Sequence, residues 1–105
     1  MTIATVKVHF DETAVHIAVA GEIDLANAAV VEDEIFAAVD NRATRVVVDL
    51  TDLRYVDSSG LRILFILAGR LETLQMAMEV VAPPGSPIRR LAQVSGLHSF
   101  IELSP

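Results

Sequence analysis

Cysteine and tryptophan are absent from this chain of 105 residues, and tyrosine occurs once. The lack of cysteine excludes disulfides and thiol chemistry. Basic clusters are also missing, because 14 acidic side chains against 8 basic ones give a net charge of −6, and no basic run exceeds Arg89-Arg90. Nucleic-acid binding requires a basic face that neutralises phosphates. We therefore expect no nucleic-acid partner.

Long apolar runs are missing as well, although 52% of the residues are hydrophobic. The longest run, residues 63–68, is far shorter than the ~20 residues of a membrane-spanning helix. The amino-terminal residues show neither the basic start nor the cleavage site of a signal peptide. The sequence therefore predicts a single domain over residues 1–105, a cytoplasmic location and no membrane partner.

The serines, histidines and acidic residues of the sequence do not form a recognisable motif for catalysis or ligand binding. Neither Ser58 nor Ser59 lies in a Gly-x-Ser-x-Gly elbow, and for none of the three histidines does the sequence point to an orienting acid. No glycine-rich phosphate loop or zinc-ligand spacing occurs, and the acids at 32–34 are typical of a solvated helix face. We expect no enzyme activity, no cofactor and no metal.

Hydrophobic periodicity predicts an α/β fold. Strands at 5–10 and 14–21 should form an antiparallel hairpin that ends at Gly21, and the β-branched strand 45–50 should be covered on both faces. Asp24 is the expected N-cap of a first helix whose apolar face begins at Leu25. The predicted order of elements is β-β-α-β-α-β-α-β, which gives a mixed and mostly parallel sheet with helices. The last three elements are expected to be a strand at 77–83, a helix at 86–96 and a strand at 99–103. Ser86 should cap this last helix and Gly96 should end it.

The stretch Asp57-Ser58-Ser59-Gly60 lies where the central strand should give way to the second long helix. One interpretation is that Asp57 or Ser58 simply caps the helix. A glycine in an exposed first turn costs about 1 kcal/mol relative to alanine, which a close approach by another chain would explain. A further interpretation makes the serine a phosphorylation site, because a helix N-terminus stabilises added negative charge.

Three segments carry a resemblance to a known family: "GEIDLANA" at 21–28, "VVVDLTDLRYVDSSGLRIL" at 46–64 and "RRLAQVSGLHSFIEL" at 89–103. They resemble the bacterial anti-sigma factor antagonists of the STAS-domain family. The resemblance implies a single STAS-type domain that binds an anti-sigma factor serine kinase and thereby releases the sigma factor. It also implies that the kinase phosphorylates the antagonist and that a PP2C-type phosphatase resets it.

Carried onto this sequence, the resemblance makes Ser58 the phosphorylation site. Arg62 departs from the small residue that the family usually has there, and it is expected to tune partner choice or to pair with the phosphate. The chain also stops where many relatives carry a further helix, which makes a homodimer one expectation. The alternative that remains open is a STAS scaffold, or a component of a stress-signalling or lipid-transport assembly, without phosphoswitching. The partner-binding residues that the resemblance implies are Asp24, Asp57, Ser59, Gly60, Leu61 and Arg62.

Overall fold

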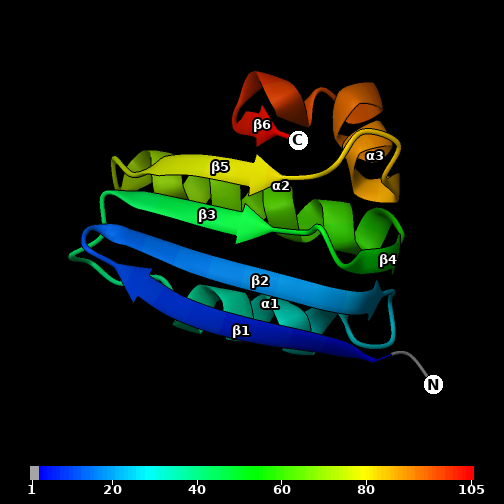
Figure 1. The fold of residues 1–105 in the computed structure, drawn as a ribbon, viewed down its shortest axis with the longest axis horizontal. Helices are drawn as coiled ribbons and strands as arrows, with labels where there is room; N and C mark the ends of the chain where they lie inside the picture. The colour runs from blue at the N-terminus through cyan, green and yellow to red at the C-terminus, as the bar shows by residue number, and fades with distance from the viewer. Residues whose placement is uncertain (1–2) are drawn as a thin grey trace.

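The computed structural model describes residues 3–105. One β-sheet forms a layer, helices α1 and α2 lie behind it, and α3 and β6 lie toward one end (Figure 1). The strands are β1 (Ala4–Asp11), β2 (Ala14–Ile23), β3 (Arg45–Asp49), β4 (Leu53–Val56), β5 (Ala77–Val81) and β6 (Glu102–Ser104). The helices are α1 (Ala28–Ala37), α2 (Ser58–Thr73) and α3 (Pro87–Ser95), followed by the short 3-10 helix η1 (Leu97–Ser99). The predicted α/β class is confirmed.

The sheet is mixed, with the main strand order β1-β2-β3-β5-β6. β1 and β2 form the predicted antiparallel hairpin, whose turn places Glu12 at a φ of 55°. The pairs β2–β3, β3–β5 and β5–β6 are all parallel. Parallel strands need crossover connections, and α1, α2 and α3 supply them.

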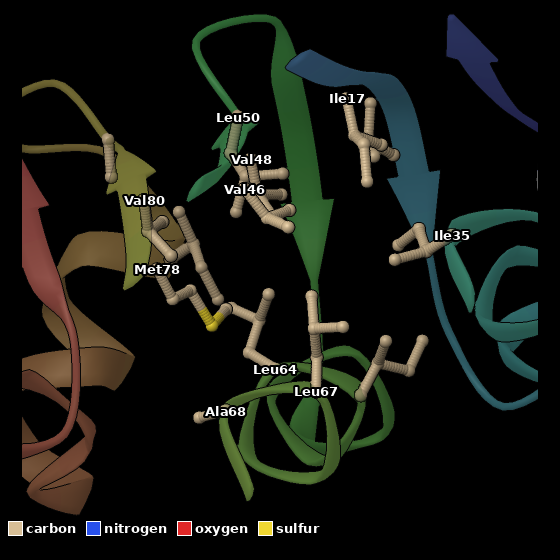
Figure 2. Packing of buried hydrophobic residues seen from close by; sticks show 14 of the residues in the cluster. Ile17, Ile35, Val46, Val48, Leu50, Leu64, Leu67, Ala68, Met78 and Val80 are labelled. Carbon is tan, nitrogen blue, oxygen red and sulfur yellow. The ribbon is translucent and has the colours of Figure 1, made fainter. Parts of the chain in front are cut away.

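The hydrophobic core lies between the sheet and its helices. Figure 2 shows Leu64 and Leu67 of α2 reaching toward Val46 and Val48 of β3. Val46, Val48 and Leu67 are completely buried, and Ile35 contributes from α1. Burial of each such side chain is worth roughly 1.5–3 kcal/mol, so the core anchors both helices to the sheet.

β3 differs from the sequence-based expectation, because helices cover only one of its faces. The opposite face of the sheet carries a hollow of about 800 Å³, lined among others by Lys7, His16, Arg45 and Val47. Arg45 donates from Nη2 to Glu79 Oε1 at 2.5 Å on this face. The apolar run at 45–50 suggested that other elements cover β3 on both faces. On this second face, charged side chains such as Arg45 and Glu79 lie beside the strand, and none of the described helices covers it.

A strand that the sequence pattern missed, β4, positions the start of α2. β2 passes Gly21 at a bulge, and its last residues then pair with β4 in parallel, with Ile23 opposite Val56. The strand therefore does not end at Gly21, as expected, but at Ile23. Gly21 has a φ of 101°, and a Cβ there would clash with the Ile3 carbonyl oxygen. The bulge redirects β2 from one neighbour to another.

α3 has the expected boundaries but not the expected cap. Pro87 opens the helix and Gly96 closes it with a φ of 85°. Ser86 stands at the N-cap position, yet its hydroxyl makes no capping hydrogen bond and is buried without a partner in the described part of the chain.

Candidate functional site

The start of α2 is capped by Asp57. Its Oδ1 accepts a hydrogen bond from the Ser59 N–H at 2.8 Å, and its backbone carbonyl accepts from Gly60 at 3.1 Å. Ser58 is the first helical residue and is exposed. Of the two capping candidates in the sequence, the aspartate is the one that caps. Within residues 3–105 the Ser58 hydroxyl takes part in no hydrogen bond of this structure.

Gly60 corrects the sequence-based interpretation of this turn. It is buried, and not in an exposed first turn as expected. A Cβ at this position would clash with a γ-methyl of Val56 and would come within 3.3 Å of Ile23 Cγ2. The close approach that requires glycine is thus made by β2 and β4 of the same chain. Because its backbone packs inward, Gly60 shapes the start of α2 without forming part of its exposed surface.

Asp24 and Asp57 lie next to each other, at the points where the chain leaves β2 and β4. Each follows directly after a member of the Ile23–Val56 pair at the carboxyl ends of two adjacent parallel strands. The Asp57 N–H also donates to the Ile23 carbonyl at 3.3 Å, which ties the two exits together. The carboxyl edge is where sites of open α/β sheets usually lie. The structure therefore places Asp24 close to the serine turn.

Asp24 is not the N-cap of α1, contrary to expectation. The helix begins at Ala28 and its N-cap is Asn27. Asp24 instead closes a preceding turn, in which its Oδ1 accepts from the Ala26 N–H at 2.8 Å. Asn27 braces that turn, accepting from the Asp24 N–H at 3.0 Å and donating to the Glu22 carbonyl at 2.9 Å. The polar residues hold the loop in place next to α2.

A hollow of about 300 Å³ separates the beginnings of α1 and α2. Ser59, which is half-buried, and Arg62 line it from α2. The lining from α1 and its preceding turn includes Leu25, Ala28, Ala29, Glu32 and Asp33. The site thus combines a small apolar floor with charged groups on its rim, next to the exposed Ser58.

Leu25 is a site residue that the sequence analysis placed in the core. The expected helical stripe starts with Leu25, but its side chain is 84% exposed because α1 begins three residues later. A large apolar side chain exposed at the rim of a hollow is a common feature of protein interfaces. No local sequence signal identifies it, because its exposure follows from the start of α1 at Ala28.

Leu61 and Arg62 differ in their surroundings. Leu61 is half-buried and packs against the core, so only part of it faces outward. Arg62 has a side chain that is 72% exposed, and its Nη1 lies 4.0 Å from Glu32 Oε1 of α1. This ion pair links the two helices across the hollow.

Groups with shifted pKa values lie away from this turn. A hydrogen bond from Arg42 lowers the pKa of Asp40 to about 2 in the loop after α1. Hydrogen bonds from Ser104 and Arg45 lower the pKa of Glu79 on the open face of the sheet. Across the described residues no three possible metal-ligating side chains come together, and no helix is long and apolar enough to cross a membrane.

Comparison with known proteins adds a decisive observation. The family model described as "Mlab, STAS domain" matches residues 6–103. The chain belongs to the STAS-domain family. A curated relative of this STAS domain is BtrV of Bordetella bronchiseptica, whose name describes it as an anti-sigma factor antagonist. The two are 33% identical over 84 residues, which cover 80% of this chain and 72% of BtrV.

Solved structures share the fold of this STAS domain. An anti-sigma factor antagonist from Mycobacterium paratuberculosis aligns with a TM-score of 0.87 at 29% identity, covering 98% of this chain and 86% of that one. The Bacillus cell fate determinant SpoIIAA, solved in its phosphorylated form, aligns with a TM-score of 0.73 at 22% identity, covering 96% and 92%. At that identity the second likeness concerns the fold alone. The sequence-based recognition of anti-sigma factor antagonists is confirmed.

Proposed function

We propose that this STAS domain is a phosphorylation-switched antagonist of an anti-sigma factor. In its unphosphorylated form it binds an anti-sigma factor serine kinase, and the sigma factor is released. Docking uses the surface formed by Asp24, Leu25, Ser59, Leu61 and Arg62 around the acceptor Ser58. The domain performs no catalysis itself: the kinase transfers a phosphoryl group to Ser58, and a PP2C-type phosphatase removes it.

The observation that carries this proposal is that Asp57, and not Ser58, caps α2. The aspartate caps α2, so the exposed serine hydroxyl is not required to begin the helix. A kinase can therefore reach Ser58 without unwinding secondary structure. The relationship to BtrV and the fold shared with the two structures above support the same assignment.

The switch has a simple physical basis. Phosphoryl transfer breaks the bond between the γ-phosphorus of ATP and the bridging oxygen of ADP, and it forms a bond from that phosphorus to Ser58 Oγ. The serine proton leaves to a base of the kinase. The product carries about −1.5 to −2 charges at the start of a helix, where backbone N–H groups and the helix dipole favour an anion. The fold should persist while docking at this edge is weakened.

The acceptor assignment is tested with Ser58→Ala and, as its matched control, Ser59→Ala. With the cognate kinase and labelled ATP, we expect Ser58→Ala to lose phosphate incorporation while still binding the kinase, and Ser59→Ala to be labelled. Full labelling of Ser58→Ala together with none of Ser59→Ala would move the acceptor to Ser59. Persistent labelling of both variants would show that the phosphorylated residue lies outside this turn.

A second candidate function is an assembly component that never becomes phosphorylated. The description of the matching family model, which names Mlab and not an anti-sigma factor antagonist, is the observation in its favour. Isolation of the protein from growing cells separates the two candidates. A phosphate on Ser58 supports the switch, whereas a stable complex whose composition is unchanged by Ser58→Ala and Ser58→Glu supports the assembly component.

A role of Ser58 or Ser59 as the nucleophile of a serine hydrolase finds no support in the fold. His9 and His16 stack on each other with ring centroids 4.7 Å apart, near the hairpin end of β2. His16 is seven residues from Ile23 along β2, or about 23 Å at the rise of a β-strand. The Nδ1 of His98 lies 3.3 Å from the Ala92 carbonyl oxygen at the end of α3.

A further inference from the structure

Arg62 stands four residues after Ser58 on α2, and its guanidinium is held only loosely. The side chain is 72% exposed, and its contact with Glu32 is 4.0 Å long. An exposed ion pair at this distance contributes little, since solvent screens it and both side chains lose rotamer freedom. The guanidinium is therefore available to a stronger acceptor.

The helical geometry places Arg62 beside the serines. At about 100° per residue, Arg62 projects about 40° beyond Ser58, between the directions of Ser58 and Ser59. Four residues correspond to about 6 Å along the axis, and side chains in a helix lean toward its N-terminus. Arg62 and Ser59 also line the same hollow, in agreement with this placement.

A phosphate on Ser58 would be a better partner for Arg62 than Glu32 is. It offers three strong acceptor oxygens and nearly twice the charge of a carboxylate. The planar guanidinium can donate two parallel hydrogen bonds to such a group. An acid four residues before a base is also the favourable order on a helix. Within the described structure, Glu32 is the competing partner and sits on a different helix.

We propose that phosphorylated Ser58 captures Arg62 from Glu32, so that one modification changes the charge on both helices of the docking surface. The inference rests on the proposed function, because it presumes that Ser58 is the acceptor. Before phosphorylation, Arg62 partly neutralises the acidic wall that Glu32 and Asp33 form on α1. After phosphorylation, the arginine covers the phosphate and Glu32 loses its ion pair. A partner then meets a changed charge on α1 in addition to the new group on α2.

The test uses protein in which phosphoserine is installed at position 58 during translation by genetic code expansion. The second pKa of the phosphate is measured by a ³¹P NMR titration in the wild-type sequence and in Arg62→Gln. We expect the wild-type value to be lower by about 0.3–1 unit, because a paired cation favours the dianion. The Nε–H signal of Arg62 should titrate with the same midpoint as the phosphate.

Arg70→Gln is the control, since it removes one positive charge from the same helix. Arg70 lies twelve residues after Ser58, about 18 Å along the axis, and its guanidinium sits 5.2 Å from the centre of the Phe36 ring. At physiological salt this distance exceeds the screening length, so the phosphate pKa should stay at its wild-type value. Equal pKa values in wild type and Arg62→Gln would overturn the inference. So would a shift in Arg70→Gln as large as that in Arg62→Gln.

The failure of this inference and the failure of the proposed function remain distinguishable. Because the phosphate is installed without a kinase, the titration reads the capture of Arg62 whether or not a kinase acts on Ser58. Loss of the pKa difference with normal kinase labelling rejects the capture alone. A clear pKa difference in a protein that no kinase labels rejects the switch and leaves the geometry of the capture standing.

Discussion

At the scale of single residues, Gly60 shows how packing against buried side chains shapes the turn at the start of α2. Its missing side chain lets α2 start directly against Val56 of β4 and Ile23 of β2. The same contact fixes where Ser58 emerges, two residues earlier on the helix. The glycine therefore positions Ser58, the proposed acceptor, through packing.

Gly60 and Gly69 form a matched pair of helical glycines for testing this role. An added Cβ meets Val56 at Gly60, whereas it meets nothing within 4 Å at Gly69. Alanine favours a helix by about 1 kcal/mol over glycine, so Gly69→Ala should stabilise by about 0.5–1 kcal/mol. Gly60→Ala should destabilise by about 1–3 kcal/mol because the site is overfilled. Urea denaturation of both variants measures the effect, and a stabilised Gly60→Ala would show that the turn relaxes freely.

Whether the sequence could predict the role of these residues depended on whether that role is set by neighbouring residues or by distant contacts. Asp57 and Ser58 could be predicted as a helix start, because capping residues are recognised from their immediate sequence neighbours. Phosphorylation of Ser58 stays a prediction. The burial of Gly60 and the exposure of Leu25 could not be predicted. Both depend on where β4 and α1 lie, and those positions are set by contacts far along the chain.

At the scale of elements, α2 depends on its aspartate cap and not on its serines. Removing the carboxylate in Asp57→Ala leaves the Ser59 N–H without its acceptor and should cost about 0.5–2 kcal/mol. Ser58→Ala should change stability by less than about 0.5 kcal/mol, as at an ordinary surface position. Thermal unfolding of the two variants provides the comparison. If Ser58→Ala were the more damaging change, the serine would have a structural role that this structure does not show.

The elements also show the limits of pattern reading. The hairpin, the central strand and the two long helices were predicted because their periodicity extends over many residues. β4 was missed because its four residues, Leu53–Val56, are too few to show a period. The start of α1 was misplaced because Leu25 continues the apolar spacing by chance, while the helix begins only at Ala28. This start could be recognised only once the turn held by Asp24 was seen.

At the scale of the whole molecule, the last strand is tied to the sheet by side chains as well as by backbone pairing. Arg45 of β3 reaches both Glu79 of β5 and Glu102 of β6, the latter at 2.6 Å. The Ser104 hydroxyl donates to Glu79 at 2.6 Å. Arg89 of α3 donates to the Ala82 carbonyl at 2.6 Å. Glu79 and Arg45 thus join the carboxyl-terminal third to the centre of the sheet, in addition to the backbone pairing of β5 and β6.

The stability of the whole domain should depend on pH through Glu79. Its pKa is lowered in the folded state, first by the Ser104 hydrogen bond and then by Arg45. A lowered pKa means that the ionised carboxylate stabilises the fold above the unfolded value of about 4.3, and that this contribution is lost as pH falls through the folded pKa.

The variant Glu79→Gln should therefore lower the thermal midpoint at neutral pH, and its difference from wild type should shrink in acid. Glu72→Gln, an exposed change near the end of α2, is the control and should show little difference at either pH. A Glu79→Gln difference that stays constant from neutral to acidic pH would mean that the carboxylate charge plays no part.

The uncovered face of the sheet also offers a practical handle on the protein. Lys7 is exposed there, on the side of the sheet away from α1 and α2, and the sequence contains no cysteine. Lys7→Cys would therefore create a unique thiol to which a fluorophore can be coupled. Since Lys7 pairs with Ala18, six residues before Asp24, the dye would sit well away from the proposed docking edge. Anisotropy of that dye would follow association and release in real time without obstructing either.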